Sequence, residues 1–256
     1  MNILFDPHVH YYKSYSTEKF FSSAYRNFER HNSISTGFAL CLTEKNDCDF
    51  FIELRSKSKI LDFQIVKNPS SLLLKSQGKL PLYIIPGRQV NSSEGIEVLA
   101  LFRSDKIEEK MPLIELVSEI LNSGGIPVIN WAPGKWLGKR GIIIDNFIQN
   151  HNGHLALGYT SLLPKNFPLP KIILKHKENL PIFWGSDPLP FKNQESLIAQ
   201  CGLEIDVSID PNDKNELDIS QFKTSLLKSN FSYFGHGSNI LDVSRRLISN
   251  EIVRRF

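Results

Sequence analysis

The sequence predicts an α/β fold in which a mainly parallel sheet closes into a barrel. Short apolar or β-branched runs alternate with amphipathic segments, which is typical of such architectures. The length of 256 residues suits one barrel, since barrels of this class commonly take about 200–250 residues. No internal repeat, low-complexity tract or linker divides the chain. Residues 1–256 are therefore expected to form a single domain.

Apolar runs predict strands at regular intervals. They lie at 2–5, 37–43, 49–54, 82–86, 96–101, 126–131, 155–159, 181–186 and 204–209. Apparent strands outnumber helices between residues 44 and 110. We therefore expect an added hairpin or antiparallel piece there, rather than clean β–α repeats.

Amphipathic segments between these runs predict helices. They lie near 17–30, 111–122, 139–150, 193–200, 218–228 and 239–250. Three begin at residues that cap helices well, namely Ser16 or Thr17, Asp218 or Ser220, and Asn239. Gly124-Gly125 is placed to end a helix before the next strand. The Pro-rich stretch 162–171 is expected to be a surface loop.

Composition limits the class of protein. A hydrophobic content of 41% and a charged content of 22% are typical of globular proteins. The net charge of +3 is too small to favour nucleic acid as the main partner, so a small anionic molecule is expected instead. No apolar run predicts a membrane helix, and the basic C-terminal segment reads as a surface helix packed on the barrel or, alternatively, as a membrane or partner contact. Three cysteines without a CxxC pattern suggest reduced thiols in a cytoplasmic protein.

Polar residues follow many of the predicted strands. Functional groups of such folds collect at the carboxyl edge of the sheet. His8 and His10 follow the first strand and share one face of an extended segment. Two imidazoles on one side suit zinc, manganese or iron, although HxH pairs also occur by chance on loops. The other residues at strand ends are Asp6, Thr43, Glu44, Arg88, Gln89, Asn130, Trp131, Lys135, Thr160 and Asp187.

Five stretches resemble, in order, the motifs of the PHP superfamily (polymerase and histidinol phosphatase type phosphoesterases), which is related in layout to amidohydrolases. They read FDPHVH (5–10), CLTEKND (41–47), IIPGRQV (84–90), GGIPVINWAPG (124–134) and WGSDPLP (184–190). The resemblance implies a distorted, seven-stranded TIM-type barrel with an added β-hairpin region. It also implies metal-dependent hydrolysis, of phosphoesters first and of amides or cyclic amides second.

The chain departs from the family pattern at several ligand positions. They carry Glu44, Lys45, Gln89, Trp131 and Leu189 in place of the usual acidic or histidine ligands. The resemblance therefore supports His8, His10 and Asp187, with Glu44 as a possible addition, as ligands of one divalent transition metal. A cationic Lys45 and a neutral Gln89 disfavour a cluster of two or three ions.

The segment NWAPGKWLGKR (130–140) offers groups for a substrate. Trp131 is expected to stack on a ring, and Lys135 and Arg140 to meet phosphate or carboxylate. Trp136 and Lys139 fit a structural role equally well. Arg88 and Gln89 complete the expected substrate-binding set, with a structural salt bridge as the alternative for Arg88. The catalytic set is Lys135, Asp187 and Glu44, the last as a general base if it is not a ligand.

Two functions follow from these residues. The first is a metal-dependent hydrolase, of phosphoesterase type, acting on a small anionic substrate. The alternative is a catalytically degenerate relative that binds a nucleotide, sugar phosphate or other anion without hydrolysis, and a scaffold protein is a third, weaker idea. Of the histidines outside the motifs, His236 stands out, because its flanking glycines suggest a tight, exposed turn.

Overall fold

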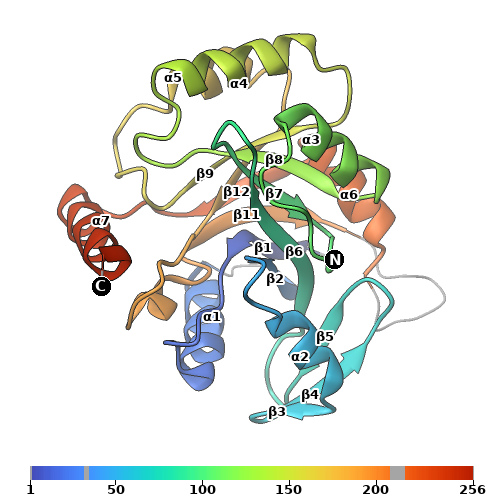
Figure 1. The fold of residues 1–256 in the computed structure, drawn as a ribbon. Helices are drawn as coiled ribbons and strands as arrows, with labels where there is room; N and C mark the ends of the chain where they lie inside the picture. The colour runs from blue at the N-terminus through green and yellow to red at the C-terminus, as the bar shows by residue number, and fades with distance from the viewer. Residues whose placement is uncertain (1, 32–34, 208–216, 256) are drawn as a thin grey trace.

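The computed structural model describes residues 2–31, 35–207 and 217–255. Its centre is a mixed, nearly closed barrel-like sheet with helices on the outside (Figure 1). The main path of the sheet has nine strands, in the spatial order β10 (Ile182–Gly185), β9 (Ala156–Thr160), β8 (Ile126–Asn130), β7 (Glu97–Leu101), β6 (Leu82–Asn91), β2 (Gly37–Glu44), β1 (Asn2–Val9), β11 (Cys201–Asp206) and β12 (Phe231–Gly235). β10 packs against β1 and β11, so the path curls back on itself.

The strand directions correct the expectation of a mainly parallel, seven-stranded barrel. Four of the neighbouring pairs are parallel, namely β1–β2, β2–β6, β8–β9 and β9–β10. The other four are antiparallel, namely β6–β7, β7–β8, β1–β11 and β11–β12. The reversal begins at the short connection between β6 and β7, because a tight turn can join only antiparallel strands.

A second antiparallel piece is attached to β6, as expected for the region 44–110. It consists of β3 (Lys59–Ile60), β4 (Phe63–Lys67) and β5 (Leu72–Lys75), and β5 pairs with β6. The predicted strand at 49–54 is wrong, because α2 (Phe50–Ser56) lies there. Phe50, Phe51 and Leu54 are buried while Ile52 is exposed, which is a helical rather than an alternating pattern.

The remaining helices lie mostly where the sequence predicts them. They are α1 (Thr17–His31), α3 (Leu113–Asn122), α4 (Lys139–Asn150), α5 (Lys171–His176), α6 (Ile219–Leu227) and α7 (Ile240–Arg255). Asp218 and Asn239 accept backbone N–H groups and so cap α6 and α7 as expected. The segment expected to be helical at 193–200 holds only a short 3-10 turn, η1 (Gln194–Leu197). α5 and β12 were not predicted.

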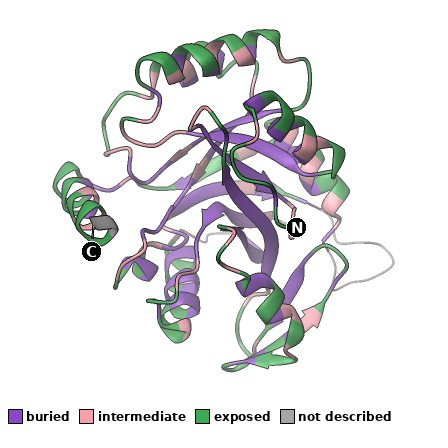
Figure 2. Cartoon of the chain, viewed as in Figure 1, coloured by how far each residue is buried: buried purple, intermediate pink, exposed green. Residues whose placement is uncertain are grey.

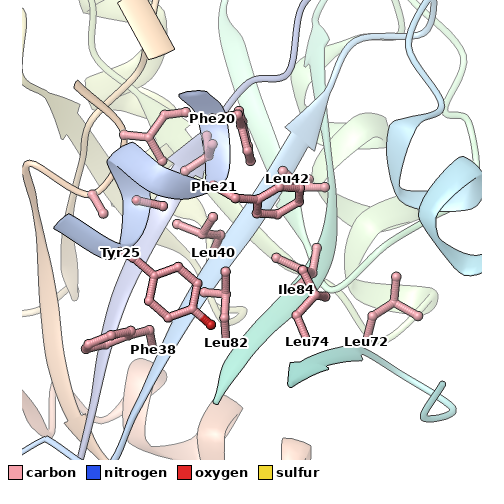
Figure 3. Close-up of a cluster of buried hydrophobic side chains, with 14 of the residues drawn as sticks. Phe20, Phe21, Tyr25, Phe38, Leu40, Leu42, Leu72, Leu74, Leu82 and Ile84 are labelled. Carbon is pink, nitrogen blue, oxygen red and sulfur yellow. The ribbon is translucent and has the colours of Figure 1, made fainter. Parts of the chain in front are cut away.

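The buried apolar side chains form three clusters. Successive side chains of a strand point to opposite faces of the sheet, so one strand can contribute to two clusters. Along β2, Phe38, Leu40 and Leu42 pack against α1 and the β4–β5 hairpin (Figure 3). Ala39 and Cys41 face the interior of the barrel instead. Most strands of the main path are accordingly buried on both faces, and the exposed residues lie mainly on the helices and the loops (Figure 2). Among the described residues, no helix combines the length and the apolar character needed to cross a membrane.

Candidate metal centre

Three buried side chains converge where β1 and β10 end. His8 and His10 come from the end of β1, and Asp187 follows β10. The Nε2 atoms of the two histidines are 3.0 Å apart, and Asp187 Oδ1 lies 3.6 Å from each. Within the described parts of the chain, this is the one group of histidine, cysteine and acidic side chains with the proximity that a metal ion requires.

The spacing of these atoms fits a single ion. Donors at about 2.0–2.1 Å from a tetrahedral zinc ion are separated by about 3.4 Å, close to the distances of 3.0 and 3.6 Å seen here. The charge state of His10 also fits. Burial, His8 and Lys45 lower the pKa of His10 well below its ordinary value, so its imidazole is neutral and carries a free lone pair. The residues present can therefore hold a divalent transition metal.

A buried carboxylate holds the backbone of this centre in place. Asp6 is fully buried, and it accepts the N–H groups of His8 at 3.2 Å, Ser186 at 3.0 Å and Ala199 at 2.9 Å. Burial raises the pKa of Asp6 to about 6 despite these hydrogen bonds. One side chain thus joins β1, the loop after β10 and the chain leading into β11.

The approach of β10 to β1 depends on a glycine. A Cβ atom on Gly185 would lie 2.5 Å from the Cβ of His8, so no larger residue fits without moving one strand. Two residues later, Asp187 adopts a φ of 46°, in the left-handed region, which Asp tolerates better than most residues. Its N–H donates to the His8 carbonyl at 2.9 Å. The turn therefore aims the Asp187 carboxylate back at the two histidines.

The loop after β10 is also held from outside the sheet. The Tyr15 hydroxyl donates to the Leu189 carbonyl at 2.6 Å. Arg246 on α7 donates to the Asp187 carbonyl at 3.0 Å, to Ser161 Oγ at 2.9 Å and to Gln194 Oε1 at 2.9 Å. Leu189, at the position of the last family histidine, is buried and contributes its backbone carbonyl to this arrangement.

Gln89 lies directly beside the histidines. It is the third residue from the end of β6, it is buried, and its Oε1 is 3.2 Å from His8 Nε2. An amide oxygen can accept an N–H or contribute a neutral ligand, but it adds no negative charge. The structure therefore places Gln89 next to the three donors, in a position to tune them.

Glu97, which the sequence reasoning missed, lies at the same edge. Its Oε1 accepts from Asn130 Nδ2 at 2.7 Å, and its Oε2 accepts from Lys135 Nζ at 2.8 Å. Burial opposes ionisation, but Lys135, His8 and the two hydrogen bonds outweigh it, and the pKa of Glu97 is lowered. Glu97 does not follow a strand, because β7 is antiparallel to β6 and brings its first residue to this edge. The sequence did contain a signal for Glu97, since this acidic residue follows a short turn and directly precedes an apolar run.

Glu44 is buried nearby but outside the three-residue group. Its Oε1 accepts the Phe51 N–H at 3.0 Å. Burial raises its pKa to about 7, offset in part by the Phe51 N–H and by Arg88. Glu44 and His10 line one cavity of about 590 Å³, together with Tyr12, Lys45 and Pro190. The structure thus places Glu44 in the same cavity as His10, outside the group of three candidate ligands.

Arg88 forms a buried structural ion pair, the alternative given for it from the sequence, and its contact with a substrate stays a prediction. Its side chain is 2% exposed and forms an ion pair of 2.9 Å with Asp49. The guanidinium also donates to the carbonyls of Ser104 and Cys48. These contacts tie β6 to the start of α2 and to the segment after β7, and they hold the guanidinium away from the donors on β1.

The remaining predicted substrate residues are dispersed. Lys135 is held by Glu97 at the edge of the metal centre. Trp131 is half-buried and lines a different, apolar cavity of about 580 Å³ with Trp136 and α7. Arg140, half-buried at the start of α4, lies near the β6–β7 turn. A contact of Trp131 or Arg140 with a substrate therefore stays a prediction.

Comparisons with known proteins give structural neighbours. No protein-family model and no curated protein matches the chain. PsfC from Pseudomonas syringae PB-5123 has a TM-score of 0.56 at 15% identity, with 99% of this chain and 98% of that chain covered. The lesion-specific endonuclease PfuEndoQ from Pyrococcus furiosus has a TM-score of 0.52 at 12% identity, with 93% of this chain and 57% of that chain covered.

These neighbours share the fold of this chain. This chain spans little more than half the length of the endonuclease. The likeness also corrects one expectation, that nucleic acid is not the main partner, because an enzyme of this fold acts on nucleic acid. A net charge of +3 was a poor argument, since binding depends on where the charges lie.

Proposed function

We propose that this protein is a divergent member of the PHP superfamily and a hydrolase that uses one divalent transition metal. The observation that carries the proposal is the convergence of His8 Nε2, His10 Nε2 and Asp187 Oδ1 within 3.0–3.6 Å. A divalent ion bound there would polarise a phosphoryl oxygen and stabilise the charge that develops on it.

The residues of the chain have distinct roles in this proposal. His8, His10 and Asp187 hold the ion, and the Asp6 carboxylate keeps their backbone in register. Glu44 lines the same cavity as His10, and its pKa of about 7 lets it exchange a proton near neutral pH. Lys135, anchored by Glu97 with its side chain 37% exposed, is placed to offset negative charge on a substrate.

The substrate class we propose is a phosphodiester of nucleic acid. A phosphoester is the substrate that the resemblance to the PHP superfamily implies. The likeness to a lesion-specific endonuclease supports nucleic acid as the source of that ester. Hydrolysis would leave a phosphomonoester and a hydroxyl end, with water as the second reactant.

A second candidate is a metal-free relative that binds an anion without hydrolysis. The observation that favours it is the Lys135–Glu97 pair, in which a cation of the chain neutralises a carboxylate at the edge of the centre. Neutral Gln89 beside His8 points the same way. The two candidates differ in whether the purified protein contains a transition metal.

Elemental analysis of protein purified without chelator separates them. We expect about one equivalent of transition metal, as in catalytic sites with three protein ligands. Asp187→Asn and His10→Ala should lose the metal and the hydrolysis of a labelled oligonucleotide and of bis(4-nitrophenyl) phosphate. His154→Ala, which changes an exposed histidine far from the centre in sequence, is the matched control and should retain both. Protein without metal, whose thermal stability chelator leaves unchanged, would rule out the hydrolase in favour of the binder.

A further inference from the structure

A second cavity, of about 610 Å³, lies beside the loop that carries Asp187. Its walls are the C-terminal end of α1, the segment 191–200, the turn between β12 and α7, and the first half of α7. α1 and α7 lie on the same side of the molecule (Figure 1). None of its lining residues belongs to the cavity shared by His10 and Glu44.

The charge of this basic cavity is strongly one-sided. Among its lining residues, four cations face a single carboxylate, Asp242. That carboxylate is partly occupied, since it accepts from Asn239 Nδ2 at 2.6 Å. The four cations are Arg30, Lys165, Arg245 and Arg246. Such a surface attracts a ligand with several negative charges, even though the whole chain has a net charge of only +3.

Two histidines in the same cavity add hydrogen-bonding groups. The rings of His31 and His236 have their centroids 6.0 Å apart. Burial, together with His236 and Arg30, lowers the pKa of His31 below its ordinary value. The arginines and Lys165 supply the positive potential of the cavity, and the imidazoles offer N–H groups to phosphate oxygens.

One of the cations is built into the protein. Arg246 is 5% exposed, and its three hydrogen bonds go to Asp187, Ser161 and Gln194. A guanidinium has five N–H donors, so these bonds leave two for another acceptor. A buried cation with spare donors at a cavity wall favours an anion there, because its own desolvation is then better compensated.

The loop after β10 connects the two cavities. Asp187 belongs to the metal centre, Pro190 lines the first cavity, and Phe191 and Gln194 line the second. Arg246 touches both sides, because it lines the basic cavity and donates to the Asp187 carbonyl. The two cavities therefore meet at adjacent residues of this loop, Pro190 and Phe191.

We propose that the basic cavity binds backbone phosphates of a nucleic-acid strand whose neighbouring phosphodiester lies at the metal centre. The second half of this statement rests on the proposed function, whereas the first half does not. A strand repeats the same phosphate at every nucleotide, so one recognition element for the backbone serves any sequence. The cavity would add affinity and set the direction of the strand without reading bases.

The test compares two triple variants with the same loss of charge. Arg30→Ala/Lys165→Ala/Arg245→Ala removes the three exposed cations of the basic cavity, and Arg246 is left intact because it contacts the Asp187 loop. Lys19→Ala/Lys59→Ala/Lys228→Ala removes three exposed cations elsewhere. The probe is a fluorescein-labelled single-stranded 20-mer, and its anisotropy is followed at several salt concentrations.

We expect the cavity variant to bind the strand about tenfold more weakly, with the slope of log affinity against log salt reduced by about 2, and the control variant to change by less than about twofold. The cavity variant should keep its metal and its turnover of bis(4-nitrophenyl) phosphate. Equal losses in both variants, or none in the cavity variant, would overturn the inference. The inference would also be overturned if calorimetry showed that inorganic phosphate binds to the cavity while the affinity for the strand stays unchanged.

The same measurement on Asp187→Asn keeps the two proposals apart. The strand should still bind Asp187→Asn, and removing the three cavity cations from that variant should weaken the binding. This outcome would confirm the basic cavity as a phosphate site, whether or not the metal centre hydrolyses a substrate. If the protein hydrolyses the small ester but binds the strand equally well with and without these cations, the cavity inference fails and the proposed function stands.

Discussion

Lys135 Nζ lies 2.8 Å from Glu97 Oε2, while Asn130 Nδ2 holds the other oxygen of Glu97 at 2.7 Å. The carboxylate next to the metal centre is thus already satisfied by the protein itself. A second metal ion would have to displace Lys135 to use Glu97 as a ligand. The pair gives a physical reason for expecting one ion here rather than two.

Lys135→Met should destabilise the protein, because it leaves Glu97 buried and without its cation. We expect a loss of about 1–3 kcal/mol in the free energy of unfolding, below the range for fully buried pairs, since the Lys135 side chain is 37% exposed. Adding Glu97→Gln should recover most of the loss. Lys175→Met, which breaks the more exposed pair with Asp145, should cost less than about 1 kcal/mol. Urea unfolding of the four proteins measures this, and equal losses at both lysines would refute the argument.

Gln89→Glu should bind metal more tightly. The new carboxylate would lie about where Gln89 Oε1 now lies, 3.2 Å from His8 Nε2, and would replace a neutral neighbour by a charged ligand. We expect metal affinity to rise about tenfold or more, measured by competition with a chelating dye. The metal-free variant should be less stable than the metal-free wild type, because an unpaired carboxylate is then buried. Unchanged affinity would show that Gln89 does not face the ion.

Stability should depend on pH through Glu44. Burial raises its folded-state pKa from 4.5 to about 7, so the stabilising contribution is complete below pH 4.5 and is lost as pH rises through 7. Glu44→Gln keeps an acceptor for the Phe51 N–H but cannot ionise. Relative to this variant, the wild type should lose up to about 3 kcal/mol between pH 5 and pH 8. Parallel pH curves from urea unfolding would argue against the raised pKa.

Gly185→Ala should separate β10 from β1. The added methyl group would lie 2.5 Å from the His8 Cβ and 2.9 Å from its N atom. We expect a loss of about 1–3 kcal/mol in stability and a clear fall in metal affinity, because Asp187 would move away from the histidines. Gly78→Ala is the control, since its new methyl group meets nothing within 4 Å and carries only the cost of a φ of 72°. A Gly185→Ala protein with wild-type metal affinity would contradict this account.

Much of the framework could be predicted from local patterns. Apolar runs marked the strands around the site, and the alternation of side chains placed His8 and His10 on one side. The rule that functional groups gather at strand ends brought Asp187 into the same group, and the structure places the three together. Their proximity was predictable, whereas metal binding itself stays a prediction.

The rest depended on long-range geometry. Glu97 reaches the site because β7 is antiparallel to β6 and β8. A short apolar run predicts a strand but not the direction of that strand in the sheet. The sequence predicts that Arg88 follows a strand, but it does not predict the ion pair with Asp49. That pair depends on the helix at 50–56, which begins directly after Asp49. The basic cavity combines residues from α1, the loop at 165 and α7, which no local pattern links.

The hydrogen bonds of Asp6 also bear on the order in which this centre forms during folding. Its carboxylate accepts hydrogen bonds from the backbone N–H groups of residues 8, 186 and 199. Two of these donors lie in the last third of the protein, so β1 and its histidines are held in their final position only after that part has folded. During synthesis, His8 and His10 emerge long before Asp187 and the chain that anchors it. The group of His8, His10 and Asp187 is therefore a product of finished folding, and any metal bound by all three would report that the barrel has closed.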